Sequence, residues 1–366
     1  MNRNVKPMKT LTILILAAGS LTNSWVAGAS PIQDDETVIF FPTSAFLDSG
    51  GQAWLIPVHG WIFEMEEDSF WRKLVVDSLP SVLEVEPEEA NRAIYEERGR
   101  MFLVDNERGK EIEIKLGGAR YAMAPSEPNG HFRGEVQVAR PELSDRKEGD
   151  WVVIQAVTPE EDERRFQGKV HLIGPRGISV ISDIDDTIKV SNVKDKKALL
   201  ANTFLKPFRA VPGMSDLYRT WEEEGAVFHY VSASPWQLYP TLSKFIADSG
   251  FPQGSFHLKN FRVKDRTFFD LFSSQEEYKK PVIESILQTY PGRRFMLVGD
   301  GGEEDPEIFA AVARSHGDQV AHIFIRDTGT SGADDERYRV IFEGIAESRW
   351  TLFNEGGDLR EFRFGE

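Results

Sequence analysis

Residues 177–191 read Gly-Ile-Ser-Val-Ile-Ser-Asp-Ile-Asp-Asp-Thr-Ile-Lys-Val-Ser, and this stretch decides the fold of the second half of the chain. Residues 178–181 form a short run rich in β-branched side chains beside a glycine, which is typical of a buried strand. Burying Asp183, Asp185 and Asp186 within that strand would cost too much, so we expect the three carboxylates at its carboxyl end. Ligands of open α/β sheets bind just beyond such strand ends. The stretch predicts either a reactive site or an acid-rich turn that caps the next helix.

Beyond residue 177 the sequence alternates between strand and helix patterns. The expected strands cover residues 178–183, 226–232, 255–258, 294–299 and 319–325. The expected helices cover residues 196–205, 213–224, 236–249, 280–290 and 305–315, and the tail at 337–366 adds a helix and a closing segment. Strands that alternate with helices imply right-handed crossovers and a parallel, doubly wound sheet. The predicted fold class of residues 176–366 is therefore α/β.

The preceding residues, 30–175, have a different pattern. Several runs alternate polar and apolar residues, as at 111–116, which suits a half-buried antiparallel sheet. The expected strands cover residues 37–41, 53–63, 101–104, 111–116, 132–139, 151–157 and 166–173. A helical insertion is expected at 69–98, where the acidic run 84–97 is most simply a solvated face. We therefore predict a β-rich, sandwich-like accessory domain that ends at Gly174-Pro175-Arg176-Gly177.

The first 29 residues have the pattern of a targeting segment. Basic residues at positions 3, 6 and 9 precede an apolar stretch at 11–21 and an Ala27-Gly28-Ala29 triplet. The apolar stretch is too short to span a bilayer, and the whole pattern is typical of a secretory signal peptide. We expect cleavage near Ala29 and a periplasmic or secreted protein, with an uncleaved anchor as the alternative.

Composition excludes several classes of function. The 366-residue chain contains no cysteine, which excludes disulfides, thiolate zinc sites and a cysteine nucleophile. Its formal net charge is −16, so bulk charge opposes binding to nucleic acid and to anionic bilayers. An anionic substrate would therefore need a local basic site or a metal ion.

Polar groups follow three of the predicted strands. Asp183 ends the first strand, Ser232 the second and Asp300 the fourth. Because the carboxyl ends of parallel strands share one rim, we expect these groups to lie together, and Lys280 at a helix start can lean over the same rim. With Asp305 nearby, the aspartates suit an oxygen-only site of the Mg²⁺ type. Each of these residues alone has an ordinary structural explanation, and their common order and placement favour a reactive site.

Phosphoryl chemistry fits this set of groups. Asp183 is the expected nucleophile, which would become an aspartyl-phosphate. Asp185, two residues on, would protonate the leaving oxygen and later deprotonate water. Ser232 and Lys280 suit phosphate oxygens, and the metal ion would neutralise charge on the transferred group.

The same segments resemble the four motifs of haloacid dehalogenase-superfamily phosphatases. More narrowly, residues 178–330 resemble the catalytic domain of the fungal actin-patch phosphatidate phosphatases and their bacterial relatives, which are similar to lipins. The motifs are Ser182-Asp183-Ile184-Asp185-Asp186-Thr187-Ile188-Lys189, Val231-Ser232-Ala233-Ser234-Pro235, Lys280 and Gly299-Asp300-Gly301-Gly302-Glu303-Glu304-Asp305-Pro306-Glu307. Gly301 departs from the usual serine of its loop and Lys279 from a common histidine, which affects substrate fit more than chemistry.

The resemblance implies a Mg²⁺-dependent phosphatase that converts phosphatidate to diacylglycerol and phosphate. The expected catalytic residues are Asp183, Asp185, Ser232 and Lys280, and the expected metal ligands are Asp183, Asp185, Asp300 and Asp305. Thr187, Ser232 and Lys280 are expected to contact the substrate. A soluble phosphomonoester is the alternative substrate, and a non-catalytic protein that binds a phosphate ligand is the alternative function.

A calcium loop of the EF-hand type is excluded. The Asp183-x-Asp185 start would require glycine at the sixth position and glutamate at the twelfth, where this sequence has Ile188 and Lys194.

A stretch between Ser232 and Lys280 is rich in aromatic and basic residues. Phe268 and Phe269 could enter a lipid interface while Lys259 and Arg262 hold an anionic headgroup, which predicts a peripheral membrane contact. The alternative is that these aromatic residues pack a cap over the sheet.

Overall fold

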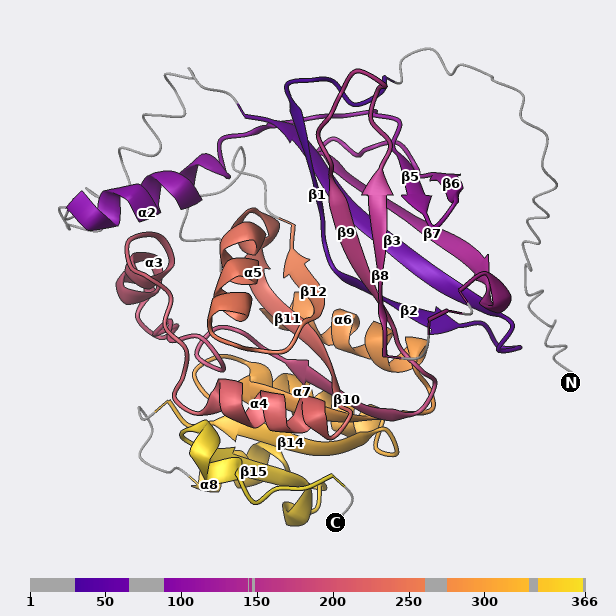
Figure 1. The fold of residues 1–366 in the computed structure, drawn as a ribbon. Helices are drawn as coiled ribbons and strands as arrows, with labels where there is room; N and C mark the ends of the chain where they lie inside the picture. The colour runs from indigo at the N-terminus through magenta and orange to yellow at the C-terminus, as the bar shows by residue number, and fades with distance from the viewer. Residues whose placement is uncertain are drawn as a thin grey trace, which may run out of the picture.

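The structure is a computed structural model of the chain, and it describes residues 30–65, 89–143, 145–146, 149–260, 275–328 and 335–364. Two β-sheets, one from each half of the sequence, lie beside each other (Figure 1). Within the described ranges, none of the helices combines the length and the hydropathy needed to cross a membrane.

A six-stranded parallel sheet forms the second half. Its strands are β10 (Gly177–Ser182), β11 (Val227–Pro235), β12 (Gly254–Lys259), β13 (Arg293–Asp300), β14 (Val320–Arg326) and β15 (Trp350–Phe353). Their order is β12-β11-β10-β13-β14-β15, and every pairing is parallel. The predicted parallel α/β sheet is confirmed, and β15 was not predicted. Because β10 lies between β11 and β13, the residues that follow Ser182 emerge at the middle of the rim.

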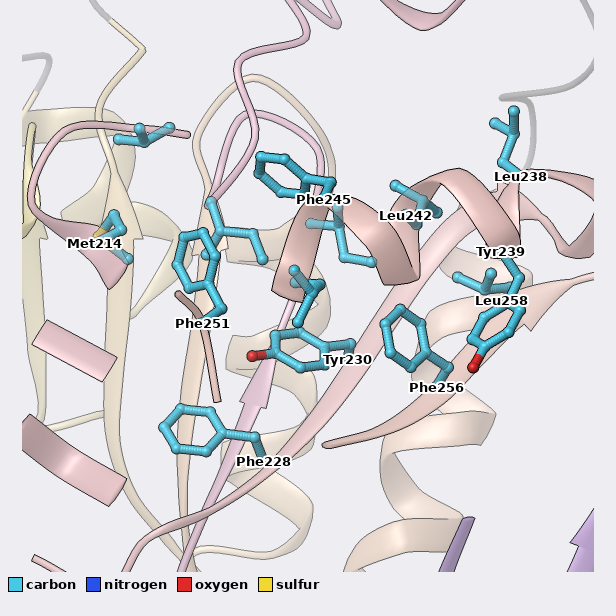
Figure 2. Packing of buried hydrophobic residues seen from close by; sticks show 14 of the residues in the cluster. Met214, Phe228, Tyr230, Leu238, Tyr239, Leu242, Phe245, Phe251, Phe256 and Leu258 are labelled. Carbon is cyan, nitrogen blue, oxygen red and sulfur yellow. The ribbon is translucent and has the colours of Figure 1, made fainter. Parts of the chain in front are cut away.

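Helices cover both faces of this sheet (Figure 1). They are α3 (Lys196–Phe204), α4 (Met214–Glu223), α5 (Tyr239–Asp248), α6 (Gln275–Thr289), α7 (Asp305–Ser315) and α8 (Asp335–Ile341). Successive side chains of a strand point to opposite faces. Val180 accordingly packs with residues of α4 and α5, whereas Ile181 packs with residues of α6 and α7. Figure 2 shows the first of these layers, with Leu242 and Phe245 of α5 over Tyr230 and Phe256 of the sheet.

The first half forms a nine-stranded sheet. Its strands are β1 (Glu36–Phe40), β2 (Thr43–Leu47), β3 (Ala53–Glu64), β4 (Asp105–Asn106), β5 (Glu113–Leu116), β6 (Ala119–Ala122), β7 (His131–Ala139), β8 (Trp151–Ala156) and β9 (Gln167–Leu172). They are connected in the order β1-β3-β2-β9-β8-β5-β6, with β4 and β7 also paired to β3. β2 pairs with both β3 and β9, so the described strands do not separate into the two independent sheets of the predicted sandwich.

One further sequence prediction for this half needs correction. Residues 101–104, expected as a strand, form a turn after helix α2 (Glu89–Arg100), and the short strand β4 follows them. Met101, Phe102 and Val104 are nevertheless buried, since they pack into a cluster shared with the second half of the chain. The apolar residues at 101–104 therefore predicted burial correctly, but they did not predict the backbone conformation. Of the predicted helical insertion, residues 69–88 lie outside the described residues.

The two halves share an apolar core. One buried cluster contains Phe41, Trp61 and Phe63 from the first sheet together with residues of β10–β12 and of α3–α5. The rings of Phe41 and Trp236 have centroids 4.1 Å apart. From α2, the guanidinium of Arg98 donates to the carbonyl of Thr203 and, over 3.0 Å, to that of Lys206.

The connection between the halves is held by one arginine. Arg293 Nη1 donates to the carbonyls of Gly174 at 3.0 Å and Arg176 at 2.5 Å, its Nη2 donates to the carbonyl of Ile178, and its Nε donates to Ser179 Oγ at 2.8 Å. The predicted domain boundary is therefore a fixed segment of backbone.

Buried histidines at the interface predict a loss of stability in acid. His59 Nε2 and His131 Nδ1 are 2.9 Å apart, and burial, followed by the charge of Arg133, lowers the pKa of His131 to about 3. Since the unfolded pKa is about 6.5, the contribution of His131 is complete above pH 6.5 and is lost as pH falls toward 3. At pH 5 the loss amounts to about 2 kcal/mol for this residue.

Urea unfolding of the parent and of His131→Gln at pH 7.5 and pH 5 measures this effect. We expect the parent to lose more stability between the two pH values than the variant does. Identical losses of stability in both proteins would contradict the assignment of this pH dependence to His131.

Candidate active site

Asp183 lies at the centre of the rim. It follows β10 directly, its N–H donates to the carbonyl of Val298 at 2.9 Å, and its side chain is almost completely buried. Thr187 Oγ1 donates to Asp183 Oδ2 at 3.0 Å, and Lys279 Nζ lies 2.8 Å from Asp183 Oδ1. These two contacts fix the orientation of the carboxylate. Thr187 therefore positions Asp183, and the structure does not test its predicted contact with a substrate.

Asp186 fixes the loop after β10 and takes no part in the cluster around Asp183. Its backbone has φ 53°, in the left-handed region that non-glycine residues rarely adopt. Its carboxylate accepts hydrogen bonds from the N–H groups of Ser191, Asn192 and Val193, at 2.7, 2.9 and 2.7 Å. Asp186 thus secures a turn while other acids of this stretch meet at the rim, and the next helix, α3, is capped by Asp195 instead of Asp186.

Asp185 is surrounded by groups that favour its ionised form. Its Oδ1 lies 2.6 Å from Lys189 Nζ and accepts a hydrogen bond from Ser191 Oγ at 2.7 Å. Its Oδ2 accepts hydrogen bonds from Ser232 Oγ at 3.1 Å and Ser234 Oγ at 2.9 Å. Burial alone would raise the pKa of Asp185, but the Lys189 charge and these hydrogen bonds outweigh it and lower the pKa to about 2. Ser232, predicted to contact phosphate, lies against Asp185.

The lysine that the structure brings to Asp183 is Lys279, which directly precedes the predicted Lys280. Lys279 Nζ contacts Asp183 Oδ1, Asp305 Oδ1 at 2.7 Å and Glu303 Oε2 at 3.2 Å, and its side chain is 1% exposed. Lys280 is partly exposed.

Helical spacing does not decide between the two lysines. Lys279 precedes the buried Ile283 and Ile286 by four and seven residues, and Lys280 precedes the buried Ile283 and Leu287 by three and seven. The contacts of Lys279 in the fold distinguish it from Lys280.

The loop after β13 brings further carboxylates to the rim. Asp300 Oδ1 accepts hydrogen bonds from Gly302 N at 2.6 Å and Glu303 N at 3.2 Å, while Asp300 Oδ2 is buried without a hydrogen-bond partner among the residues that the structure describes. Asp305, the first residue of α7, binds Lys279 through one oxygen and accepts from Asp300 N through the other. A Cβ at Gly299 would overlap the Asp305 carboxylate, so this approach requires glycine.

Gly301 has a structural explanation for its departure from the family pattern. A Cβ at this position would overlap the hydroxyl of Tyr338 in α8. The tyrosine therefore fills the space that a serine side chain would need.

The residues at this loop fit a hard divalent cation. Oxygen atoms of Asp183, Asp300 and Glu303 lie within 4.8 Å of one another, and oxygen-only sets of this kind suit Mg²⁺ or Ca²⁺. Burial, together with the neighbouring carboxylates, raises the pKa of both Asp183 and Asp300 well above the ordinary value. A bound cation would favour the ionised forms, and it would give the orphaned Asp300 Oδ2 a partner.

Of the four predicted metal ligands, the structure brings Asp183 and Asp300 together with Glu303, whereas Asp185 and Asp305 contact Lys189 and Lys279. The sequence did not single out Glu303, because a glutamate after a glycine pair at a helix start is also an ordinary first-turn residue.

The remaining predicted contacts are those of Lys259, Arg262 and the aromatic residues after them. Lys259 ends β12, two strands from β10, which places its backbone about 10 Å away at the usual strand spacing. Arg262, Phe268 and Phe269 lie outside the described residues, so the predicted lipid contact stays a prediction.

Comparisons with known proteins agree with the motifs. Residues 178–327 match the family described as "Phosphatidate phosphatase APP1, catalytic domain". An uncharacterized protein of Schizosaccharomyces pombe is 32% identical over 180 residues, covering 48% of this chain and 29% of that protein. Phosphatidate phosphatase APP1 of Saccharomyces cerevisiae is 34% identical over 166 residues, covering 44% of this chain and 28% of that protein. The chain thus spans less than a third of the length of either relative.

Solved structures give a weaker likeness. An apo phosphoserine phosphatase aligns with 40% of this chain and 85% of its own, at 12% sequence identity and a TM-score of 0.27.

The prediction of export is wrong. The finding that contradicts it is the similarity to Phosphatidate phosphatase APP1 of Saccharomyces cerevisiae. Residues 1–29 lie outside the described residues. A few basic residues followed by eleven mostly apolar ones are enough to produce the pattern of a signal peptide. The pattern alone is therefore weak evidence for export.

The motif resemblance itself is confirmed, and it now has defined bounds. Residues 178–327 of this chain are similar to the catalytic domain of a phosphatidate phosphatase of the APP1 type, and the match supports a phosphatase enzyme.

Proposed function

We propose that this protein is a Mg²⁺-dependent phosphatase that hydrolyses a phosphomonoester through an aspartyl-phosphate, with phosphatidate as its substrate. One observation carries the proposal: Asp183 lies buried at the centre of the strand-end rim, between Lys279 and the carboxylates of Asp300 and Glu303. The family match at residues 178–327 supports phosphatidate as the substrate.

Asp183 acts as the nucleophile in this proposal. One of its carboxylate oxygens forms a bond to phosphorus while the ester oxygen leaves with the electron pair of the broken bond. Thr187 and Lys279 hold the carboxylate in place and restrict its rotation. Asp183, Asp300 and Glu303 would hold Mg²⁺, which would supply positive charge beside the transferred phosphoryl group.

Asp185 carries protons in both half-reactions. Its protonated form gives a proton to the leaving oxygen, and its ionised form, which Lys189 and the serines favour, accepts a proton from the water that hydrolyses the aspartyl-phosphate. The products are the free alcohol, here diacylglycerol, and inorganic phosphate.

Phosphate release by the purified full chain tests the proposal. Phosphatidate in detergent micelles is compared with a soluble aryl phosphate, each with Mg²⁺, with EDTA, and with EDTA followed by excess Mg²⁺. We expect release from phosphatidate with Mg²⁺, a fall of at least about tenfold with EDTA, and recovery when Mg²⁺ is restored. Activity that EDTA leaves unchanged would contradict the proposed dependence on a metal ion. Hydrolysis of the aryl phosphate but not of phosphatidate would contradict phosphatidate as the substrate.

A further inference from the structure

A pocket of about 460 Å³ lies between the two halves of the chain, apart from the cluster around Asp183. One wall comes from β2, β3 and β7 of the first sheet, and the other comes from β11, β12 and α6. Its volume falls within the range of small-molecule sites. Most of its surface is apolar, with walls that include Phe46, Val58, Trp236, Leu258 and Ile286. A hydrocarbon group is therefore the expected class of occupant.

The charge of the pocket also restricts its ligand. None of the described residues that line it is acidic, although the chain has 59 Asp and Glu residues. Arg133 is the one lining residue with a permanent positive charge, and it is exposed. Burial lowers the pKa of His257 to about 4, so this histidine is neutral at pH 7. The ligand that fits is a hydrocarbon chain with an anionic end.

One end of the pocket adjoins the catalytic rim. Arg133 interacts electrostatically with Tyr278, which also lines the pocket and directly precedes Lys279. Trp236 lies two residues after Ser234, which binds Asp185. From Tyr278 the pocket follows α6 as far as Thr289, a distance of about 16 Å at the helical rise. Arg133 thus lies near the end of α6 that carries Lys279, and the pocket extends from there along the helix toward its other end.

We propose that this pocket binds the hydrocarbon chain of a lipid phosphomonoester whose phosphate lies at Asp183, with Arg133 beside the polar end of the chain. The inference rests on the proposed function, and it adds a site that selects substrates by their chain. Burying each further methylene in the pocket strengthens binding about fourfold, until the chain fills the available length.

Alkylphosphonates test the pocket without turnover, because their carbon–phosphorus bond resists hydrolysis. Binding of butyl-, octyl- and dodecylphosphonate to the full chain is measured by calorimetry with Mg²⁺ present. Ser285→Trp fills the pocket from α6, and Gln288→Trp adds the same ring to an exposed position of that helix outside the pocket. We expect affinity to rise with chain length in the parent and in Gln288→Trp, and to lose that dependence in Ser285→Trp.

Arg133→Gln provides a second variant that does not change the volume of the core. We expect it to weaken dodecylphosphonate about tenfold while leaving a neutral alcohol of the same length unaffected. Equal behaviour of Ser285→Trp and Gln288→Trp would overturn the inference, as would affinity that is independent of chain length.

Two further outcomes separate this inference from the proposed function. If no phosphomonoester is hydrolysed but chain-length dependence persists and disappears in Ser285→Trp, the proposed reaction fails and the pocket remains. If dodecanoate binds the pocket without competing with dodecylphosphonate or with phosphatidate hydrolysis, the pocket belongs to a separate fatty acid and the substrate-chain assignment is overturned.

Discussion

Asp183→Asn is expected to lower phosphatase activity by more than about a thousandfold, because loss of a covalent nucleophile has effects of this size or larger. The amide has nearly the same shape as the carboxylate and can still accept the hydrogen bond from Thr187, but it lacks the anionic oxygen that attacks phosphorus. Lys279 keeps Asp305 and Glu303 as partners, so the fold should persist.

The measurement is phosphate release from phosphatidate, with Asp216→Asn as the matched control. Asp216 lies on α4 with its side chain 67% exposed, and it undergoes the same chemical change far from the cluster. Circular dichroism of both variants checks folding. Activity of Asp183→Asn close to that of the parent would eliminate the covalent mechanism.

Lys279→Met and Lys280→Met are expected to differ strongly in stability and activity, although the two positions are neighbours. Lysine and methionine have similar helix propensities, so the comparison isolates the surroundings of each side chain. Removing Lys279 leaves Asp183, Asp305 and Glu303 buried without their shared cation, which costs about 3–5 kcal/mol for a broken buried pair. Lys280 is partly exposed, and its replacement should change stability by less than about 0.5 kcal/mol.

Urea unfolding and phosphatidate hydrolysis are measured on both variants. Lys279→Met should also lose at least about a hundredfold in activity, because Asp183 would no longer be held in the orientation needed for attack. If Lys280→Met were the inactive variant and Lys279→Met behaved like the parent, the contacts of α6 would be assigned to the wrong lysine.

The parallel sheet could be predicted because its signals are local. Residues 178–181 are apolar and β-branched, and Asp305-Pro306-Glu307 begins a helix with a proline and acidic residues in its first turn. The predicted helix at 305–315 coincides with α7. Asp183 could be found for the same reason, since its carboxylate directly follows a buried strand.

Other features depend on contacts between distant residues. β15 is a four-residue strand that pairs with β14, and its sequence Trp-Thr-Leu-Phe alone does not distinguish it from a loop. The turn at 101–104 is buried because the second half of the chain covers it. Glu303 joins the oxygen cluster only because the glycine-rich loop folds back toward Asp183. Such contacts between distant residues depend on the whole fold, so short sequence patterns do not predict them.

The core shared by the two halves affects how the second half can be transferred to another protein. The segment that matches the APP1 family ends at residue 327 and contains neither β15 nor Phe41 and Trp61 of the first sheet. A chimera that joined only this segment to a foreign chain would expose the surface that Phe41 and Trp61 cover, and it would free Arg293 from the carbonyls of Gly174 and Arg176. We therefore expect residues 178–327 to fold stably in a chimera only when the preceding sheet is transferred with them.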